Sequence, residues 1–422
     1  MKKLKLTQLV DNHGCLSEYD PNALTYNKAV NLLKEFLIKK NQDSVISIKD
    51  ASGFILAKDI KSPINVPNYN NSAMDGYVFK SKYLKKKNEI KVAGQILAGH
   101  PVGKKIATNE CFQIMTGGMI PKDFDTVIPQ EFITKKEDAV FFDFKPKKNA
   151  NIRLTGEDIK KGEVALKKGT YLNPCHIGLI ASLGIEKIRV FKPLNIGFFS
   201  TGDEVKKVGS KIKPGEVYDS NRYLISSMIK NNNYNLTDYG NLSDDKKMLQ
   251  DQLKEAARYS DVVVTTGGVS VGEADFMKEI LSKIGQVLFW KMSIKPGRPM
   301  AFGKIKSCFY FGLPGNPVSA AVTFLQFVQP SLKLLSGSNF EPIPELKIKL
   351  SSNIIRKKGR KEFLRGLIFS DKDGWKVRPL NQQGSGMLKS MSDANCFIII
   401  NEDVDNLKKD DLVVVQPFHS IF

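Results

Sequence analysis

The chain of 422 residues lacks the sequence features of several protein classes. Its five cysteines are scattered and form no Cys-x-x-Cys pair, which argues against both a disulfide framework and a zinc site. No apolar run approaches the roughly 18 residues of a membrane-spanning helix. Internal repeats and low-complexity tracts are also absent. We therefore expect a cytoplasmic globular protein of about two to four domains, with buried thiols and no membrane partner.

Arginine is scarce although the chain is strongly basic. Lysine and arginine number 64 against 44 acidic residues, a formal net charge of +20, yet only nine of the 64 are arginine and none precedes Arg153. Readout of nucleic-acid bases favours the planar fork of arginine. The lysines are mostly dispersed pairs beside acidic or apolar residues. This pattern favours a solvated lysine surface, and we expect no nucleic-acid partner.

Four kinds of segment indicate a multidomain protein of α/β plus β class. Residues 1–53 and 151–192 are expected to form a mixed helical and linker domain. Residues 54–150 contain short β-like runs broken by proline and glycine, which predicts a β-rich insertion domain. Residues 193–336 should form an α/β domain. Residues 337–422 have β-like runs and a hairpin signal at Asp373-Gly374, which predicts a β-barrel-like domain.

Strand-like and helix-like segments take turns within residues 193–336. Apolar runs such as NIGFFST, DVVVTT and CFYFGL each precede a longer segment with helical spacing. This alternation is typical of a doubly wound parallel sheet with βαβ crossovers. Runs that are apolar throughout fit strands buried on both faces.

Three loops that follow strands of this sheet are rich in glycine: residues 202–204, 267–275 and 314–319. Ligands of doubly wound sheets bind at the carboxyl ends of the strands, so these loops should converge on one edge. Backbone N–H groups of glycine turns and helix N-termini can hold a phosphate or carboxylate. The loops match neither the Walker A nor the G-x-G-x-x-G pattern, which disfavours a generic ATPase and a Rossmann dehydrogenase. A tight turn without ligand remains the alternative for each loop alone.

Acidic residues accompany these loops, among them Asp203, Glu204, Asp219, Glu273 and Asp275. Together they would repel a phosphate unless a divalent cation lay between them. Because Mg²⁺ is held by one or two carboxylates plus phosphate oxygens, we predict Mg²⁺ as cofactor, with Glu204, Glu273 and Asp275 as its ligands. Capping of a helix explains each acid equally well when it is taken alone.

Cations gather in the segment FWKMSIKPGRPMAFG, where Lys291, Lys295 and Arg298 surround a Pro-Gly turn. Cations clustered in a loop suit an oxyanion, although surface lysines are common in this chain. The β-rich insertion and its continuation hold a second group of loops, residues 67–77, 114–118 and 155–158. Their short polar side chains and glycines suit binding more than packing.

Eight motifs give the sequence a family resemblance. In chain order they are NNSAMDGYVF, QIMTGGMIP, TGEDIKKGEV, STGDE, DVVVTTGGVSVGEADF, WKMSIKPGRPMAFG, FGLPGNPVSA and QQGSGML. In this order they resemble the MoeA-type molybdopterin molybdenumtransferases, whose eukaryotic relative is the C-terminal part of gephyrin. The resemblance extends from about Ala29 to about Val415. It implies a homodimer of four-domain subunits that carries out the last step of molybdenum cofactor synthesis, with residues 1–53 and 151–192 as the dimerisation domain.

The resemblance also implies substrates and site residues. Adenylylated molybdopterin and molybdate would be the substrates, with Mg²⁺-dependent hydrolysis releasing AMP, and a molybdopterin adenylyltransferase is a candidate transient partner. The implied catalytic residues are Asp75, Asp158, Glu204, Asp275, Lys291 and Lys295. The implied substrate-binding residues are Thr116, Asp244, Gly267, Gly268, Ser270, Gly272, Arg298, Pro314, Gly315, Asn316, Pro317 and Ser385.

Two other functions compete with this interpretation. An adenylyltransferase that activates molybdopterin with ATP is built on a similar α/β domain, but it would not need NNSAMDGY and the β insertion. A non-catalytic scaffold is the other alternative, and the intact acids Asp75, Asp158 and Asp275 disfavour it.

Overall fold

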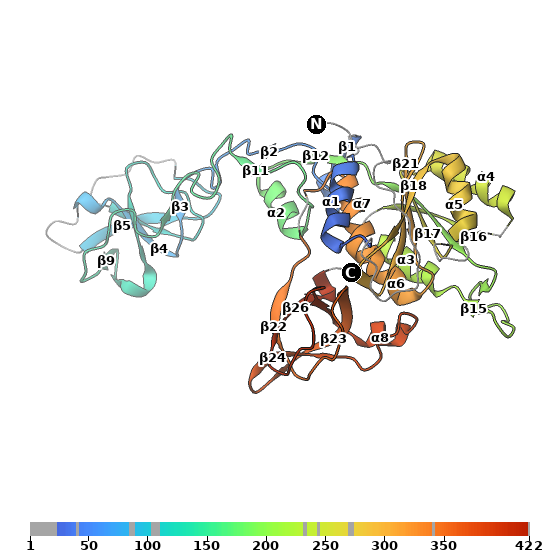
Figure 1. Cartoon of the computed structure of the whole chain (residues 1–422). Coiled ribbons are helices and arrows are strands. Elements are labelled where there is room, and N and C mark those ends of the chain that lie inside the picture. Colours follow the sequence, from blue (N-terminus) through green and yellow to red (C-terminus); the bar gives the residue numbers. More distant parts are fainter. Residues whose placement is uncertain are drawn as a thin grey trace. The chain divides into compact units, whose positions relative to one another are not determined.

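The computed structural model describes residues 23–38, 42–83, 89–102, 110–230, 234–242, 245–268, 274–339 and 342–420. Contacts divide the chain into two compact units (Figure 1). The first unit comprises residues 1–44, 53–55 and 190–422, and the second comprises residues 45–52 and 56–189. The four domain limits expected from the sequence stay predictions.

A six-stranded mixed sheet forms the centre of the first unit, in the order β16-β13-β17-β21-β20-β18. Its four parallel strands are β13 (Asn195–Thr201), β16 (Asn235–Leu242), β17 (Val262–Thr266) and β21 (Cys308–Leu313). One strand, β20 (Pro299–Ile305), is antiparallel to its two neighbours β21 and β18 (Gln286–Lys291), so the edge strand β18 again runs in the direction of the other four. The doubly wound parallel sheet is confirmed, and it carries one antiparallel strand that the sequence did not indicate.

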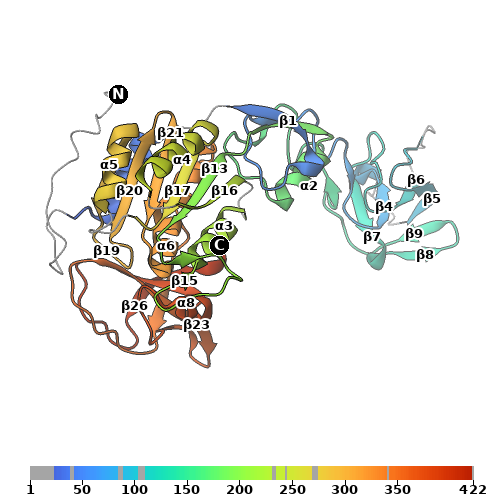
Figure 2. The same cartoon turned by 90° about the vertical axis from the view of Figure 1, so that its right-hand side faces the viewer.

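Helices cover both faces of this sheet (Figures 1 and 2). They are α1 (Tyr26–Phe36), α3 (Ser220–Lys230), α4 (Lys246–Tyr259), α5 (Ala274–Ile284), α6 (Pro317–Thr323) and α7 (Gln329–Leu335), with a π-helical stretch, Phe324–Val328, between the last two. Val262 and Val264 pack in the core with α1, α3, α6 and α7, whereas Val263 packs with α4 and α5. Successive side chains of a strand point to opposite faces, so the wholly apolar run VVV follows from burial on both sides.

The helical stretch Pro317–Leu335 is long and apolar enough to cross a membrane, and it is the single such stretch in the described part of the chain. However, 83% of its most apolar window is buried inside the protein. Val318, Phe324 and Leu332 belong to the main hydrophobic core, so packing against the sheet accounts for the apolar character of this stretch.

Five strands of the first unit close into a ring, β22 (Leu346–Leu350), β24 (Gly374–Pro379), β23 (Lys361–Asp371), β25 (Cys396–Ile400) and β26 (Leu412–Pro417). The predicted hairpin at Asp373-Gly374 is confirmed, because Asp371 pairs with Gly374 at the turn between β23 and β24. The short strand β19 (Ile294–Lys295) adds to β23. Helix α8 (Leu388–Asp393) precedes β25. The expected β-barrel-like C-terminal region is therefore present.

The second unit is rich in β structure, as the sequence indicated. A six-stranded sheet has the order β7-β4-β6-β5-β9-β8. These strands are β4 (Gly76–Phe79), β5 (Glu89–Ile96), β6 (Glu110–Ile114), β7 (Thr126–Pro129), β8 (Thr134–Lys136) and β9 (Ala139–Phe141). Two-stranded ladders join β2 (Ile60–Lys61) to β11 (Val164–Leu166), β3 (Asn71–Ser72) to β10 (Ile152–Arg153), and β1 (Asp43–Ser47) to β12 (Lys187–Phe191). Helix α2 (Pro174–Ser182) is capped by Asn173.

The described cysteines are free thiols. Cys111, Cys308 and Cys396 are buried, and burial raises the pKa of each thiol to about 12, which keeps it protonated and unreactive. Cys175 is exposed in the first turn of α2, so the expectation of buried thiols was wrong for this residue. The exposure follows from its place on the solvent side of a short helix.

Candidate functional site

The three glycine-rich loops of the sheet begin side by side. Ser200 of β13 is in register with Thr266 of β17, and Thr266 is in register with Leu313 of β21. The backbone N–H of Gly267 donates to the Leu313 carbonyl at 3.1 Å, and the Thr201 hydroxyl donates to the Thr266 carbonyl at 3.1 Å. The predicted convergence on one sheet edge is thus confirmed for the described parts of these loops.

Glycine is required where the second loop leaves β17. Gly267 and Gly268 have φ angles of +86° and +65°, in the left-handed region. A Cβ atom on Gly267 would lie 2.5 Å from the Thr201 hydroxyl oxygen. The backbone of this loop therefore lies directly against the end of β13, with no side chain between them.

The third loop meets a loop that comes from the barrel. Asn221 donates its side-chain N–H to the Gly315 carbonyl at 2.6 Å, and the Val318 N–H donates to the Ser385 carbonyl at 2.9 Å. Asn316 precedes α6, yet its side chain makes no capping hydrogen bond. Pro314, Gly315, Asn316, Pro317 and Ser385 are therefore neighbours, as their assignment to one site requires.

Glu204 is an exposed carboxylate of the first loop, next to the exposed Asp203. Its oxygens lie over Gly202, because a Cβ atom on Gly202 would be 2.8 Å from Oε2 of Glu204. Within the described part of the chain, this carboxylate makes no hydrogen bond or ion pair. The loop then continues into β14 (Val205–Lys206), which pairs with β15 (Val217–Tyr218). Glu204 thus stands at the strand ends with its oxygens available to a ligand.

Asp219 has a different role from Glu204. Its side chain is 5% exposed and accepts hydrogen bonds from the backbone N–H and from Nε of Arg222, at 3.1 and 2.9 Å. Arg222 also donates to Asp238 at 3.1 Å and to the Ser200 hydroxyl at 2.9 Å. Arg222 therefore ties α3 to β13 and β16, and the capping interpretation of Asp219 is confirmed.

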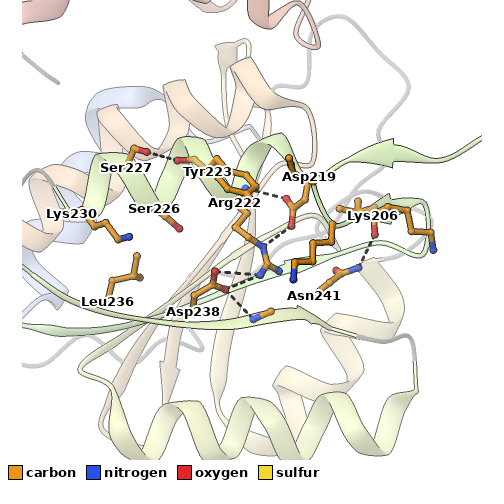
Figure 3. Close-up of a pocket in the computed structure, with 14 residues that line it drawn as sticks. Lys206, Asp219, Arg222, Tyr223, Ser226, Ser227, Lys230, Leu236, Asp238 and Asn241 are labelled. Atoms are coloured by element: carbon orange, nitrogen blue, oxygen red, sulfur yellow. Dashed lines mark hydrogen bonds and ion pairs between the residues drawn. The ribbon is translucent and has the colours of Figure 1, made fainter. Parts of the chain in front are cut away.

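A pocket of 590 Å³ lies beside these strand ends, between α3, β16 and the start of β14 (Figure 3). Arg222 crosses the pocket toward Asp219 and Asp238, and Asn241 connects it to the first loop by donating to the Gly202 carbonyl at 3.1 Å. The Ser226 hydroxyl, which also lines the pocket, is buried and has no hydrogen-bond partner among the described residues. Sequence reasoning missed this pocket, because its lining residues are scattered between positions 205 and 241 without a motif.

Two cations of the segment, Lys291 and Lys295, lie in strands rather than in the predicted loop, whereas Arg298 lies in the predicted Pro-Gly turn. Lys291 ends β18, Lys295 ends β19, and Arg298 directly precedes β20. The turn is held against α6, since a Cβ atom on Gly297 would lie 2.6 Å from the Thr323 hydroxyl oxygen and 3.4 Å from the Ser319 carbonyl oxygen. Strand pairing therefore fixes the backbone at Lys291 and Lys295, whereas Arg298 lies between β19 and β20.

Asp75 and Thr116 form a compact pair within the second unit. The Thr116 backbone N–H and hydroxyl both donate to Oδ1 of Asp75, at 2.6 and 2.7 Å. The two hydrogen bonds lower the pKa of Asp75, and the backbone one contributes more than the one from the hydroxyl. They keep the exposed carboxylate ionised. Asp158 is exposed and is positioned by its N–H bond to the Val66 carbonyl at 3.1 Å.

Several predicted residues lie outside the described residues: Asp244, Ser270, Gly272 and Glu273. Asp275 falls in the first turn of α5, as expected, but its side chain is not described. The described residues hold no cluster of three or more His, Cys, Asp or Glu residues with metal-binding geometry. The predicted roles of the site residues stay predictions.

Sequence reasoning missed one buried cation of the barrel. Arg365 is fully buried on β23 and donates to the carbonyls of Gln382 and Gly384 at 3.2 and 3.0 Å, which holds the loop that carries Ser385. Burial lowers the pKa of Arg365 to about 10, so it stays charged at neutral pH. An arginine inside the otherwise apolar run FLRGLIF was the signal available in the sequence.

Three family descriptions match successive parts of the chain. The MoeA N-terminal region (domain I and II) matches residues 24–184, the probable molybdopterin binding domain matches residues 197–334, and the MoeA C-terminal region (domain IV) matches residues 347–418. Together they cover both units and the barrel.

Individual proteins show the same similarity. The chain is 39% identical over 401 residues to the molybdopterin molybdenumtransferase of Haemophilus influenzae, covering 94% of this chain and 99% of that protein. It is 30% identical over 362 residues to the enzyme of that name from Staphylococcus aureus, covering 84% and 86% of the two chains. A crystal structure of the molybdopterin biosynthesis moeA protein from Pyrococcus horikoshii matches with a TM-score of 0.82 at 28% identity, covering 94% of this chain and 100% of that one. The chain therefore belongs to the MoeA family, the family of the molybdopterin molybdenumtransferases.

Proposed function

We propose that this protein transfers molybdenum from molybdate to adenylylated molybdopterin and releases AMP in a Mg²⁺-dependent hydrolysis, the last step of molybdenum cofactor synthesis. The observation that carries this proposal is the meeting of three strand-end loops at one edge of the sheet, where the third loop also meets the Ser385 loop of the barrel. Family membership supports the reaction, and the geometry supports the place where it occurs.

Anion binding is supported by the backbone of this edge. Gly268 and Gly315 present main chain without side chains, which lets a phosphate approach their N–H groups closely, whereas the N–H of Gly267 already donates to the Leu313 carbonyl. Lys295 adds a half-exposed ammonium group on β19. The proposed substrate carries a pyrophosphate and is used with an oxyanion, so both features match its charge.

Space for a nucleotide is supported by the pocket beside the strand ends. Its volume of 590 Å³ lies inside the range of about 300–1,000 Å³ that is common for small-molecule sites. Lys207 and Lys230 line it and make no ion pair with any residue in the described part of the chain. We place the adenylyl group of the substrate toward this pocket.

Magnesium fits the chemistry of Glu204. Its carboxylate is exposed at the strand ends and makes no contact with another described polar side chain, which is what an oxygen ligand of Mg²⁺ needs before the metal arrives. Glu204 would hold the ion with Glu273 and Asp275. The bound ion would supply positive charge at phosphate oxygens. The chain's own groups orient the substrate: glycine N–H groups hold the phosphates, and Lys295 meets the oxyanion.

We also propose that the protein acts as a cytoplasmic homodimer, because the MoeA resemblance implies one. Light scattering of the purified protein should give twice the chain mass of 47.2 kDa. A mass of 47.2 kDa over the working concentration range would reject the dimer. A molybdopterin adenylyltransferase remains the proposed transient partner that supplies the adenylylated substrate.

The reaction is tested with purified protein, adenylylated molybdopterin, MgCl₂ and molybdate. We expect AMP release that requires both the metal ion and molybdate, followed by activation of a molybdenum-dependent apoenzyme. Consumption of ATP with free molybdopterin would instead identify an adenylyltransferase. Binding of adenylylated molybdopterin without release of AMP would favour a non-catalytic scaffold.

A further inference from the structure

Lys295 is paired with an acidic residue of the barrel. Strand β19 runs parallel to β23, and Lys295 is in register with Glu362. Their side chains form an ion pair with 3.6 Å between Nζ and Oε1. The lysine side chain is 49% exposed, whereas the glutamate side chain is 6% exposed. Lys295 is thus the solvent-exposed partner of a buried carboxylate, that of Glu362.

Glu362 is itself held by a second cation. Nε of Arg356 lies 3.4 Å from the same Oε1 atom, and the Arg356 side chain is 2% exposed. The remaining nitrogens of Arg356 donate to the backbone carbonyls of Asn401 at 3.0 Å, of Arg360 at 2.6 Å, and of Val404. Arg356 is therefore fixed by main chain, and Glu362 is the carboxylate that balances its buried charge.

The three groups carry a net charge of +1, and the exposed member is Lys295. At 3.6 Å the contact with Glu362 is an ion pair beyond hydrogen-bond length, so the ammonium N–H donors are not consumed by it. A free lysine loses much rotamer freedom when it orders around a ligand. Because Glu362 already restricts the Lys295 side chain, less conformational entropy is lost when Lys295 binds an anion, which favours binding.

We propose that Glu362 is a positioning residue that holds Lys295 for the oxyanion substrate. This inference rests on the proposed function, in which Lys295 meets molybdate. Glu362 acts through Lys295 and does not touch the substrate, because its carboxylate is buried between the two cations. Arg356 in turn holds the carboxylate in place, with its Nε atom 3.4 Å from Oε1.

The test compares Glu362→Gln, Lys295→Ala and the double variant in AMP release at varied molybdate concentration. We expect Glu362→Gln to raise the KM for molybdate about tenfold with little change in kcat, since ground-state binding of the oxyanion is weakened. In the Lys295→Ala background the same substitution should have no further effect on that KM. Equal effects in both backgrounds, or an unchanged or lower KM in the single variant, would overturn the inference.

A second variant separates positioning from folding. Glu362→Gln also leaves Arg356 without its counter-charge, so a lower melting temperature alone says nothing about Lys295. Glu362→Asp keeps that charge but shortens the reach to Lys295 by one methylene, and it should raise the molybdate KM while the protein stays folded. If the molybdate KM of Glu362→Asp equals that of the wild-type protein, the proposal is contradicted, even if the Glu362→Gln variant does not fold. Absence of AMP release in the wild-type protein would reject the proposed function itself.

Discussion

Thr116 donates two hydrogen bonds to one carboxylate oxygen of Asp75, from its backbone N–H at 2.6 Å and from its hydroxyl at 2.7 Å. The two residues are 41 positions apart, and each comes from a loop that sequence motifs had singled out. The pair fixes the direction of an exposed carboxylate that would otherwise rotate freely.

The first prediction concerns the pKa of this carboxylate. Thr116→Val removes the hydroxyl donor, so the pKa of Asp75 should rise toward its ordinary value without returning fully, because the backbone donor remains. Since the folded-state pKa is lowered, Asp75 favours the folded state above its unfolded-state pKa, and this contribution is lost as pH falls through the folded-state value. NMR titration of the Asp75 side chain measures the shift, and an identical curve in both proteins would contradict it.

The second prediction concerns magnesium. Glu204→Gln keeps the size of the side chain but removes its charge, so AMP release should require at least about tenfold more Mg²⁺. The control is Asp251→Asn on the exposed surface of α4, whose nearest cation is Lys254 at 3.9 Å, and it should leave the Mg²⁺ requirement unchanged. Titration of MgCl₂ in the AMP assay gives both values. If Glu204→Gln and the control needed the same Mg²⁺ concentration for AMP release, Glu204 would not be a ligand of the metal ion.

The third prediction compares two glycines with similar backbone angles. Gly267 has a φ angle of +86°, and a Cβ atom built on it would collide with Thr201. Gly209 has a φ angle of +91°, and a Cβ atom built on it would have no heavy atom within 4 Å. Both alanine variants meet backbone strain, but only Gly267→Ala adds a collision. It should lower the free energy of unfolding by about 1–3 kcal/mol more than Gly209→Ala does. Urea unfolding measures the difference, and equal losses would mean that the contact with Thr201 relaxes freely.

The fourth prediction concerns the tie between α3 and the sheet. Arg222→Met removes the partner of a buried carboxylate, Asp219, and should cost about 2 kcal/mol of unfolding free energy. Asp238→Asn removes the more exposed partner and should cost less than half of that. Denaturant unfolding of both variants ranks the two contacts. A larger loss in Asp238→Asn would show that the exposed pair dominates.

The sheet edge was predictable from the sequence because its signals are local. Apolar runs such as VVVTT are followed directly by glycines, and parallel pairing then brings the loops together without further information. The same reasoning placed Gly267, Gly315 and Glu204 at one edge. Element bounds followed the pattern closely, as in the run NIGFFST, which forms β13 (Asn195–Thr201).

Contacts between distant residues had no such signal. Lys295 and Glu362 are brought together by β19, a two-residue strand too short to leave a periodic pattern, and the cations around it were therefore expected in a loop. Arg222 pairs with Asp219 through local helix geometry, but its contact with Asp238 depends on how α3 packs on β16. Sequence spacing predicts elements, whereas side-chain geometry decides which charges meet.

The most direct test of the site is the position of molybdenum in the protein. Crystals of the wild-type protein grown with Mg²⁺ and AMP and then soaked in molybdate should show an anomalous peak for molybdenum about 4 Å from Nζ of Lys295, the separation expected when the ammonium donates to an oxygen of the anion. Crystals of Lys295→Ala treated in the same way should lack that peak. A peak in the wild-type protein that avoids Lys295 and the Ser385 loop, or one that persists unchanged in Lys295→Ala, would contradict the site proposed here.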